Sequence, residues 1–370
     1  MKYINGPFNY IQLIGNINNI QKNITIFMDV HLDINNQTRC ESFDSSDISQ
    51  YLYQLIKDTN IPLDFFLEIQ NENLNQPQTD KKDIYIFEAI EMFKSEFNIE
   101  HDKVKYSKSN KNVRLHYLDI RDHLKFIYVI DELNNNILPK LNFLKITSQV
   151  DSNKINKLEE IKQNIDTIKK YTNDIFEKYM NIYLHKSLKF TKKSQEYYLN
   201  KIIHKYKNKD VKKNIDEFHK KNIIDYNSKF NTLTSEIMLY IILYKADINN
   251  KSYLSELYRL YHKLYDIILE LYGLITDVYF LRRFLDKDYI QNVITYCGRN
   301  HALNYIYFLV KYCNFTITKI YDTNELTIDD ITNKIKETDD LNKIYNLFLF
   351  EGEKPKQCVE SPKYNTQLVW

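Results

Sequence analysis

The chain has 370 residues, with 51 basic and 49 acidic side chains and a formal net charge of +2. At about 150 residues per domain, this length predicts two or three folding units. The balanced charge argues against a dedicated nucleic-acid-binding protein, which needs a strong positive surplus to neutralise phosphates. The sequence contains no run of about 18 uncharged apolar residues, and its first residues lack the basic-then-apolar layout of a signal peptide. We therefore expect a protein that is not transmembrane and that binds no nucleic acid specifically.

The composition also indicates a source. The chain holds only 5 Gly, 3 Ala and 7 Arg, against 44 Lys and 31 Tyr. The scarce residues use GC-rich codons and the abundant ones use AT-rich codons, which indicates an AT-rich genome such as that of a giant virus or of certain protists. The four cysteines, Cys40, Cys297, Cys313 and Cys358, lie far apart and form no CxxC pair. We therefore expect reduced thiols and a cytoplasmic location, in the host cytoplasm or in the virion if the source is viral.

The first part of the chain, residues 1–125, alternates between predicted strands and predicted helices. These elements are, in order, a strand at Ile24–Val30, a helix that starts at Ser46, a strand at Leu63–Ile69, a helix from Asp83 to Phe97 and a strand at Val113–Ile120. Such an order is typical of a parallel sheet. We predict an α/β fold, with a mostly parallel sheet flanked by helices.

A large all-helical insertion is predicted at residues 126–275. One apolar seam with spacings of three and four runs from Leu158 to Ile182, and a second runs from Leu254 to Val278. We expect these two stretches to pack as long antiparallel helices. Residues 151–230 also carry 19 Lys against 11 acidic side chains. This surplus is typical of a solvated helix face in a lysine-rich chain, and a contact with nucleic acid or an anionic membrane is the alternative.

The α/β pattern returns at residues 276–351 and completes the first domain. Its predicted elements are a strand at Asn292–Cys297, a helix at Ala302–Tyr312, a strand at Phe315–Tyr321 and a helix capped by Thr327. The remaining residues, 352–370, are predicted to form a disordered tail.

Residues that could carry chemistry follow the predicted strands, and the carboxyl ends of parallel strands meet at one edge of a sheet. Asp29 and His31 follow the first strand, Glu68 follows the second, and His301 follows the late strand. Histidine with carboxylates suits Mn, Fe or Zn, and a histidine oriented by a carboxylate could instead activate water directly. Asp29, His31, Glu68 and His301 are therefore our candidate catalytic residues and candidate ligands of a divalent metal.

Two arginines are candidates for stabilising a developing oxyanion, namely Arg121 beyond the third strand and Arg282 near the end of a long helix. Both also have a structural explanation. Arg121 could join Arg114, Asp119 and Asp122 in a salt-bridge cluster. For Arg282, a cation in the last turn of a helix is favoured by the helix dipole. His116, in the same strand as Arg114, could likewise be a packing residue.

The order of these motifs resembles the superfamily of erythromycin esterases, ChaN-type haem-binding lipoproteins and TraB/Tiki-type metalloproteases. Its members show an early Gly-Glu-x-His or Gly-x-x-His element, an acidic residue after the second strand and a late Gly-x-x-His. Here Met28-Asp29-Val30-His31 stands at the early position, Glu68 at the acidic position and Gly298-Arg299-Asn300-His301 at the late position. Met28 replaces the usual glycine, and Asp29 replaces the commoner glutamate. The resemblance implies a hydrolase-like α/β domain built around these residues.

Four segments are also similar to uncharacterised giant-virus (mimivirus-like) proteins that have a Gly-Asp-x-His start. These segments are Thr25–His31, Leu63–Ile69, Val113–Asp122 and Asp277–Phe315.

Two functions follow from these patterns. The first is a viral hydrolase-like protein that acts on an unknown small-molecule or peptide substrate, with water activated directly or on a metal; a paralogue that kept the fold and lost activity fits the departures at Met28 and Asp29. The second is a non-catalytic structural or interaction protein that binds a protein partner through its helical region, where aromatic residues would serve as anchors. The absence of a P-loop and of Gly-x-Gly-x-x-Gly disfavours nucleotide-dependent enzymes with those loops.

Overall fold

The computed structural model describes residues 2–30, 34–68, 84–97, 105–117, 119–146, 152–184, 189–192, 194–323, 325–348 and 356–362. The chain forms two compact units. One comprises Met1–Asp119, Tyr206–Ile215 and Tyr279–Trp370, and the other comprises Ile120–Lys205 and Asp216–Val278. We call the first the sheet unit, because it holds the strands, and the second the helical unit.

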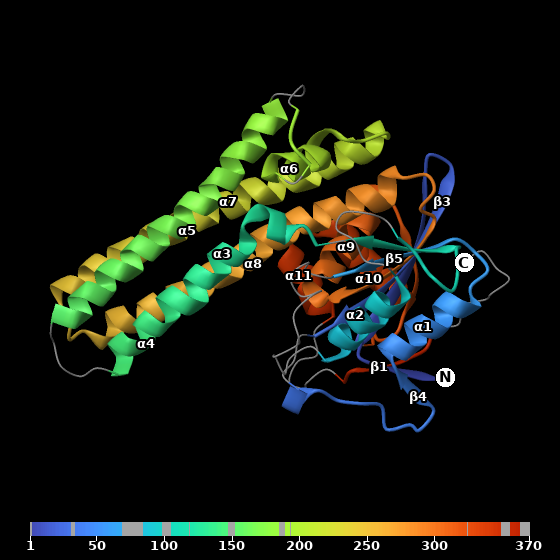
Figure 1. Cartoon of the computed structure of the whole chain (residues 1–370), viewed down its shortest axis with the longest axis horizontal. Coiled ribbons are helices and arrows are strands. Elements are labelled where there is room, and N and C mark those ends of the chain that lie inside the picture. The colour runs from blue at the N-terminus through green and yellow to red at the C-terminus, as the bar shows by residue number, and fades with distance from the viewer. Residues whose placement is uncertain are drawn as a thin grey trace. The chain divides into compact units, whose positions relative to one another are not determined.

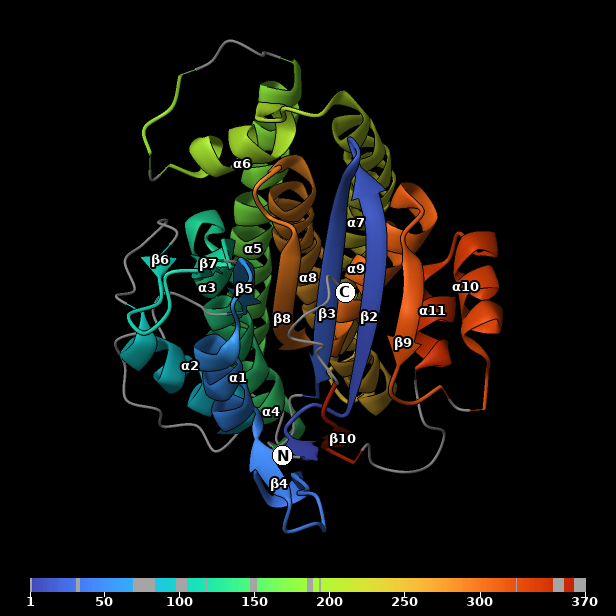
Figure 2. The same ribbon diagram turned by 90° about the vertical axis from the view of Figure 1, so that its right-hand side faces the viewer.

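The main sheet of the sheet unit has the strand order β6-β7-β5-β8-β3-β2-β9, and β8, β3, β2 and β9 are seen side by side in Figure 2. The strands are β2 (Asn9–Ile17), β3 (Ile20–Asp29), β5 (Leu63–Leu67), β6 (Lys105–Tyr106), β7 (Val113–Tyr117), β8 (Asn292–Gly298) and β9 (Thr316–Ile320). The neighbours β7, β5, β8 and β3 pair in parallel. The pairings β6–β7, β3–β2 and β2–β9 are antiparallel. The sheet is therefore mixed. The sequence predicts a mostly parallel sheet, and the three antiparallel pairings contradict that part of the prediction.

The difference arises from a β-hairpin formed by β2 and β3. Its two turn residues, Asn18 and Asn19, have φ angles of 51° and 62°. Left-handed backbone at both central positions is the geometry of a type I′ turn, which asparagine tolerates better than most residues. The hairpin adds β2 on the outer side of β3 and lets β9 join β2 antiparallel.

The central strands are covered on both faces by helices. On one face, α1 (Ile48–Asp58) and α2 (Ile84–Glu96) bury an apolar core with Phe27, Phe65 and Tyr296. On the other face, α9 (Arg299–Cys313) and the last residues of α8 (Lys251–Asp286) supply Tyr305 and Phe280, and the Phe280 ring packs against Phe66 at a centroid distance of 5.0 Å. Two short helices, α10 (Ile328–Glu337) and α11 (Leu341–Leu347), contact α9. Strand alternation thus separates the side chains of the sheet into two different cores.

A second, smaller sheet joins the two ends of the chain. It has the order β10-β1-β4, with β1 (Tyr3–Asn5) parallel to β4 (Ser45–Asp47) and antiparallel to β10 (Cys358–Glu360). A short 3₁₀ helix, η1 (Ile34–Asn36), precedes β4. β10 lies in the segment expected to be disordered, so that expectation was wrong for residues 356–362. Residues 352–355 and 363–370 of the predicted tail lie outside the described residues.

This small sheet also brings together two cysteines that the sequence suggested were reduced. Cys40 and Cys358 form a disulfide, with Cα atoms 5.1 Å apart and a sequence separation of 318 residues. The backbone N–H of Cys40 donates to Asn5 Oδ1, and Asn5 is the register partner of Cys358. The expectation of a chain without disulfides was therefore wrong. The spacing of the cysteines along the sequence does not indicate this disulfide, because Cys40 and Cys358 come together only when β10 pairs with β1.

The helical unit consists, in its described part, of helices in an antiparallel arrangement, and its long helices lie side by side in Figure 1. They are η3 (Arg121–Leu124), α3 (Phe126–Asp131), η4 (Glu132–Ile137), α4 (Leu138–Ile146), α5 (Ser152–Leu184), α6 (Gln195–His204) and most of α7 (Lys209–Ala246) and α8. Two ion pairs show the direction of α5: Lys125 meets Asp174, whereas Lys140 meets Glu160. The segment from α3 to α4 therefore runs antiparallel to α5.

The two apolar seams predicted from the sequence belong to α5 and α8, and these two helices run in the same direction. Tyr179 of α5 contacts His219 at the start of α7, and Tyr240 near the end of α7 contacts Tyr253 near the start of α8. α7 is thus antiparallel to both α5 and α8. Because the chain reverses once between α5 and α7 and again between α7 and α8, α5 and α8 run in the same direction. The predicted antiparallel pairing of the two seams was wrong because a third long helix, α7, lies between α5 and α8 in the chain.

No helix among the described residues is both long enough and apolar enough to cross a membrane.

The disulfide yields a first prediction. Replacing Cys40 with Ser should lower the free energy of unfolding by about 2–4 kcal/mol, because a bond that closes a long loop restricts the unfolded chain. Urea unfolding without reductant measures this difference. With reductant, the wild-type curve should move to that of the variant while the variant curve stays unchanged. Four free thiols in the denatured, unreduced wild-type chain, instead of two, would contradict the pairing.

Candidate functional site

The candidate site lies at the carboxyl edge of the parallel strands, around Gly298. β8 lies between β5 and β3, and Gly298 at its end is the register partner of Asp29 at the end of β3. Glu68 immediately follows β5. Gly298 is also the N-cap residue of α9, so the strand passes into the helix without a loop. Because α9 begins at the edge of the sheet, His301 in its first turn is placed next to the ends of the strands.

Glu68 and His301 form the central pair of the site. Glu68 Oε1 lies 3.2 Å from His301 Nε2, and their side chains are only 9% and 11% exposed. The second carboxylate oxygen, Oε2, accepts a hydrogen bond of 2.9 Å from the backbone N–H of Gly298. A carboxylate at the N-terminus of a helix is also stabilised by the helix dipole. Glu68 is therefore fixed at both oxygens, and it fixes the histidine in turn.

Asp29 is held by a different set of partners. Its Oδ2 accepts a hydrogen bond of 2.7 Å from the Tyr296 hydroxyl, and its Oδ1 accepts from Val30 N at 2.7 Å and from Gln357 Nε2 at 3.3 Å. The residue is 2% exposed. Neither Tyr296 nor Gln357 is among the candidate residues selected from the sequence. Tyr296 stands two residues before Gly298 and could have been placed beside Asp29 from strand alternation, whereas nothing in the sequence connects Gln357 to β3.

Asp29 and the Glu68–His301 pair lie on opposite faces of the sheet. Tyr296, the partner of Asp29, belongs to the core beneath α1 and α2. Leu67 belongs to that same core, and Glu68 follows it by one residue, so the Glu68 side chain is directed to the face covered by α9. The structure thus brings Glu68 and His301 together and keeps Asp29 apart from them.

The fourth candidate, His31, lies outside the described residues. Within the described residues, no group of three or more His, Cys, Asp and Glu side chains could hold a metal ion. This agrees with the separation of Asp29 from Glu68 and His301.

The two candidate arginines have aromatic neighbours. Arg282 belongs to the sheet unit, is 3% exposed and lies with its guanidinium carbon 5.4 Å from the centre of the Tyr279 ring. Burial lowers the pKa of this guanidinium. Arg121 belongs to the helical unit and stacks over Phe126 at 5.2 Å. A third arginine, Arg299, is the first residue of α9, two positions before His301, and was not selected from the sequence.

A buried cluster of charged side chains lies toward the amino edge of the parallel strands, away from the carboxyl edge that holds Glu68 and His301. Asp64, which is fully buried, accepts two hydrogen bonds from Arg114, at 2.7 and 2.6 Å. Its Oδ1 also lies 2.6 Å from His116 Nε2, and Arg283 Nη2 lies 3.1 Å from His116 Nδ1. An arginine can only donate, so Nδ1 is the acceptor and Nε2–H donates to Asp64.

The protonation state of this cluster follows from its geometry. His116 is neutral, in agreement with the lowering of its pKa by burial, against which the Asp64 carboxylate acts in the opposite direction. The sequence predicts a salt-bridge cluster of Arg114 with Asp119, Arg121 and Asp122, whereas the carboxylate that Arg114 contacts is Asp64. We interpret the cluster as a structural one, because every member is held by another member.

This cluster yields a second prediction. Replacing Asp64 with Asn should lower the free energy of unfolding by about 3–5 kcal/mol, because removal of one partner leaves a buried charge uncompensated. Asp58→Asn is the matched control: Asp58 is exposed at the end of α1 and accepts hydrogen bonds from Gln54. Its replacement should change the unfolding free energy by less than about 0.5 kcal/mol. Equal urea midpoints for the two variants would show that the cluster contributes nothing to stability.

Comparison with known proteins identifies relatives along almost the whole chain. The model of a "Family of unknown function (DUF5847)" matches residues 2–250 and 219–367. Uncharacterized protein R706 of Acanthamoeba polyphaga mimivirus is 30% identical over 379 residues, covering 91% of this chain and 90% of the relative. Uncharacterized protein R161 of the same virus is 30% identical over 410 residues, covering 93% of this chain and 94% of the relative. No solved structure matches the chain.

These matches bear on the two resemblances inferred from the sequence. They agree with the similarity to uncharacterised mimivirus-like proteins, and none of them supports the similarity to erythromycin esterases, ChaN-type lipoproteins or TraB/Tiki-type proteins. The chain therefore belongs to the family of unknown function DUF5847, and the relatives of the chain include uncharacterised mimivirus proteins.

Proposed function

We propose that this protein is a hydrolase-like enzyme in which Glu68 and His301 act together as a general base without a metal. The observation that carries the proposal is the double fixation of Glu68, by Gly298 N–H at 2.9 Å and by His301 Nε2 at 3.2 Å. A carboxylate held in this way can fix the tautomer and the orientation of an imidazole, which is the role of the acidic residue in catalytic dyads and triads.

The chemistry assigns each nitrogen of His301 a role. Nε2–H donates to the Glu68 carboxylate, so the lone pair of the neutral ring is on Nδ1, which can take a proton from an attacking water. The imidazolium that forms is stabilised by the adjacent carboxylate. Backbone N–H groups in the first turn of α9 and the guanidinium of Arg299 are the groups closest in sequence that could stabilise an oxyanion.

Two features of the fold support this assignment. The pair lies at the carboxyl ends of parallel strands, which is where α/β proteins place their ligands. Both side chains are also largely buried, and the low dielectric constant of such a site strengthens the interaction between them. The substrate class that suits a single general base is a carboxylic or phosphoric ester or a peptide.

The proposal is tested by hydrolysis of a panel of ester, peptide and phosphoester substrates. For the substrate that the wild type cleaves, Glu68→Gln and His301→Gln should each lower kcat at least about 100-fold, which is the usual contribution of a positioned general base. The matched control is His262→Gln, which removes an exposed imidazole from α8. Its kcat should stay within about twofold of the wild type, and metal chelators should leave the wild-type rate unchanged.

Two results would overturn the proposal: a wild-type protein that cleaves nothing in the panel, or a His301→Gln variant that is as active as the wild type. A urea unfolding curve for each variant separates loss of chemistry from loss of folding.

A specific observation favours a second function, a non-catalytic interaction protein. Ile224, Leu239 and Ile242 of α7 are 61%, 52% and 63% exposed, although large apolar side chains are usually buried. Under this hypothesis, a Leu239→Asp/Ile242→Asp variant fails to bind a protein partner that the His301→Gln variant still binds.

A further inference from the structure

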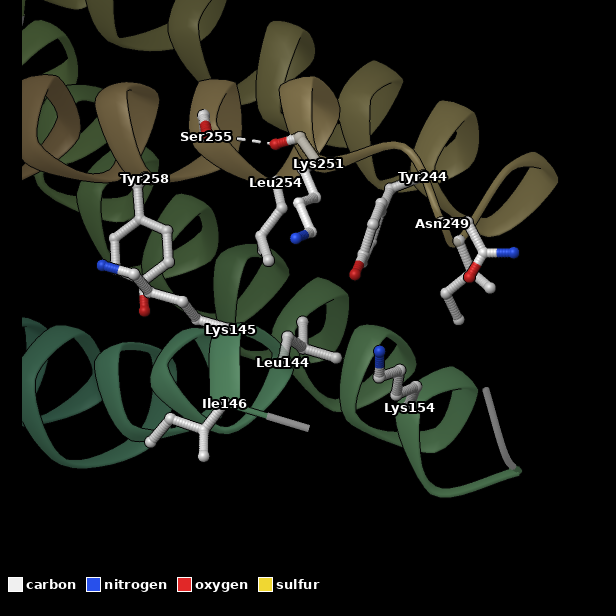
Figure 3. Close-up of a pocket in the computed structure, with 11 residues that line it drawn as sticks. Leu144, Lys145, Ile146, Lys154, Tyr244, Asn249, Lys251, Leu254, Ser255 and Tyr258 are labelled. Atoms are coloured by element: carbon white, nitrogen blue, oxygen red, sulfur yellow. Dashed lines mark hydrogen bonds between the residues drawn. The ribbon is translucent and has the colours of Figure 1, made fainter. Parts of the chain in front are cut away.

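The outward face of α7 carries exposed apolar side chains, whereas its inward face packs within the helical unit. Ile242 is 63% exposed, and Tyr244, two residues later, is 2% exposed. Figure 3 shows Tyr244 pointing from α7 into the cavity that is also lined by α4, α5 and α8. Two residues correspond to a rotation of about 200° around the helix axis, so Ile242 and Tyr244 lie on opposite faces of α7.

The exposed apolar side chains form the two ends of a single stripe. Ile224 and Ile242 are separated by 18 residues, which is five turns, so they lie in line along the helix. Leu239 lies next to Ile242, one turn before it. Between the ends, the stripe consists of small polar residues, including the exposed Ser228 and Ser235. Small side chains at the contact let two packed helices approach closely.

This pattern matches itself when the helix is reversed. In an antiparallel pair of α7 helices related by a two-fold axis at the level of Leu233, Ile224 of each copy lies opposite Ile242 of the other copy. A two-fold axis brings one surface against the same surface of a second copy, so a self-complementary pattern is what such an interface requires. A partner of another kind imposes no such symmetry on the stripe.

The charges beside the stripe follow the same symmetry. Lys229 and Glu236 are both exposed and lie seven residues apart, which is about two turns, so they share one side of α7. They are placed almost symmetrically about position 233, and in the antiparallel pair Lys229 of each copy lies opposite Glu236 of the other. Within one chain, Lys229 pairs with Asp225 at 2.6 Å, and both side chains are more than half exposed. Such an exposed pair is weak and leaves Lys229 able to meet a second carboxylate.

The same surface continues from α7 onto α8. A groove of about 370 Å³ lies between the two helices, and its lining includes the apolar residues Leu233 and Ile267. The charged residues of its lining are two lysines and three carboxylates, namely Lys229, Lys263, Glu236, Asp266 and Glu270. Charges of both signs on one surface suit a second copy of that surface better than a uniformly acidic or basic partner.

We propose that the chain forms a homodimer through antiparallel pairing of the α7 helices, with the two-fold axis at the level of Leu233. The dimer does not depend on the activity proposed for Glu68 and His301. It identifies a second copy of the chain as the partner for the α7 face on which the second candidate function rests.

The first test is sedimentation velocity of the full chain from about 1 to 200 µM. The wild type should pass from monomer to dimer over this range, because a contact centred on one helix belongs to the small, transient class of interfaces. Ile242→Asp should weaken dimerisation at least about tenfold, since it places a carboxylate opposite the apolar Ile224 of the other copy. The matched control, Ile146→Asp, changes a side chain of α4 that is 83% exposed and should stay within about twofold of the wild type.

The second test exchanges the charges. Lys229→Glu and Glu236→Lys should each weaken dimerisation at least about threefold, because each places like charges opposite one another. The variant with both changes should return to within about twofold of the wild type, because opposite charges face each other again. Added salt should reduce all these differences, since exposed charges are screened.

The orientation of the pair is tested by cross-linking. When Ile224→Cys and Ile242→Cys proteins are mixed and mildly oxidised, they should form a disulfide-linked dimer that contains one copy of each. Either variant alone should give no more cross-linked dimer than the wild type, because identical positions lie far apart in an antiparallel pair. Parallel pairing predicts the opposite result.

The proposal is overturned if the wild type stays monomeric at every concentration, or if Ile242→Asp dimerises as strongly as Ile146→Asp. It is also overturned if the variant with both charge changes dimerises no better than the variants with one. A monomeric wild type that needs Leu239 and Ile242 to bind another protein would show that the face serves a different partner. A urea unfolding curve for each variant separates loss of association from loss of folding.

Discussion

The interaction on which the sheet unit depends is the burial of Lys22 at the end of α8. Lys22 is 1% exposed, and its ammonium group donates to three backbone oxygens, those of Phe284 at 3.0 Å, Lys287 at 2.9 Å and Ile290 at 2.6 Å. Burial lowers the pKa of this side chain to about 8, so it remains charged at neutral pH. A cation at a helix C-terminus satisfies carbonyl groups that have no partner within the helix and interacts favourably with the helix dipole. In this way β3 holds the segment that leads from α8 into β8, and β8 enters the sheet between β3 and β5.

The same helix end is held from two further directions. Asp286 accepts hydrogen bonds from the backbone N–H groups of Lys207 and Asn208, which fixes the chain before α7. Arg283 contacts the Asp64 cluster through His116, and Arg114 donates to the carbonyl oxygen of Tyr289 at 2.8 Å. Polar groups at the amino edge of the parallel strands are thus used to anchor α8, whereas those at the carboxyl edge surround Gly298. This division explains why Asp64 and His116 have a structural role although they are the more deeply buried pair.

How far the sequence could predict the site depends on strand alternation. The short apolar strands and the Gly-x-x-His element were sufficient to bring Glu68 and His301 to one edge, because β5 and β8 are parallel neighbours. They were not sufficient to tell which face each side chain occupies, because a shift of one residue at the end of a strand reverses the face. Asp29 therefore appeared to belong with Glu68, whereas its partners are Tyr296 and Gln357.

The hairpin and the disulfide were missed for different reasons. The hairpin has a signal in the sequence, since Asn18 and Asn19 are residues that accept left-handed backbone, but the apolar run that predicts the strand begins only at Ile24, whereas β3 begins at Ile20. The Cys40–Cys358 bond had no local signal at all, because it depends on the pairing of β10 with β1 at the two ends of the chain. Local patterns can predict a turn, and they cannot predict a contact that only the completed fold creates.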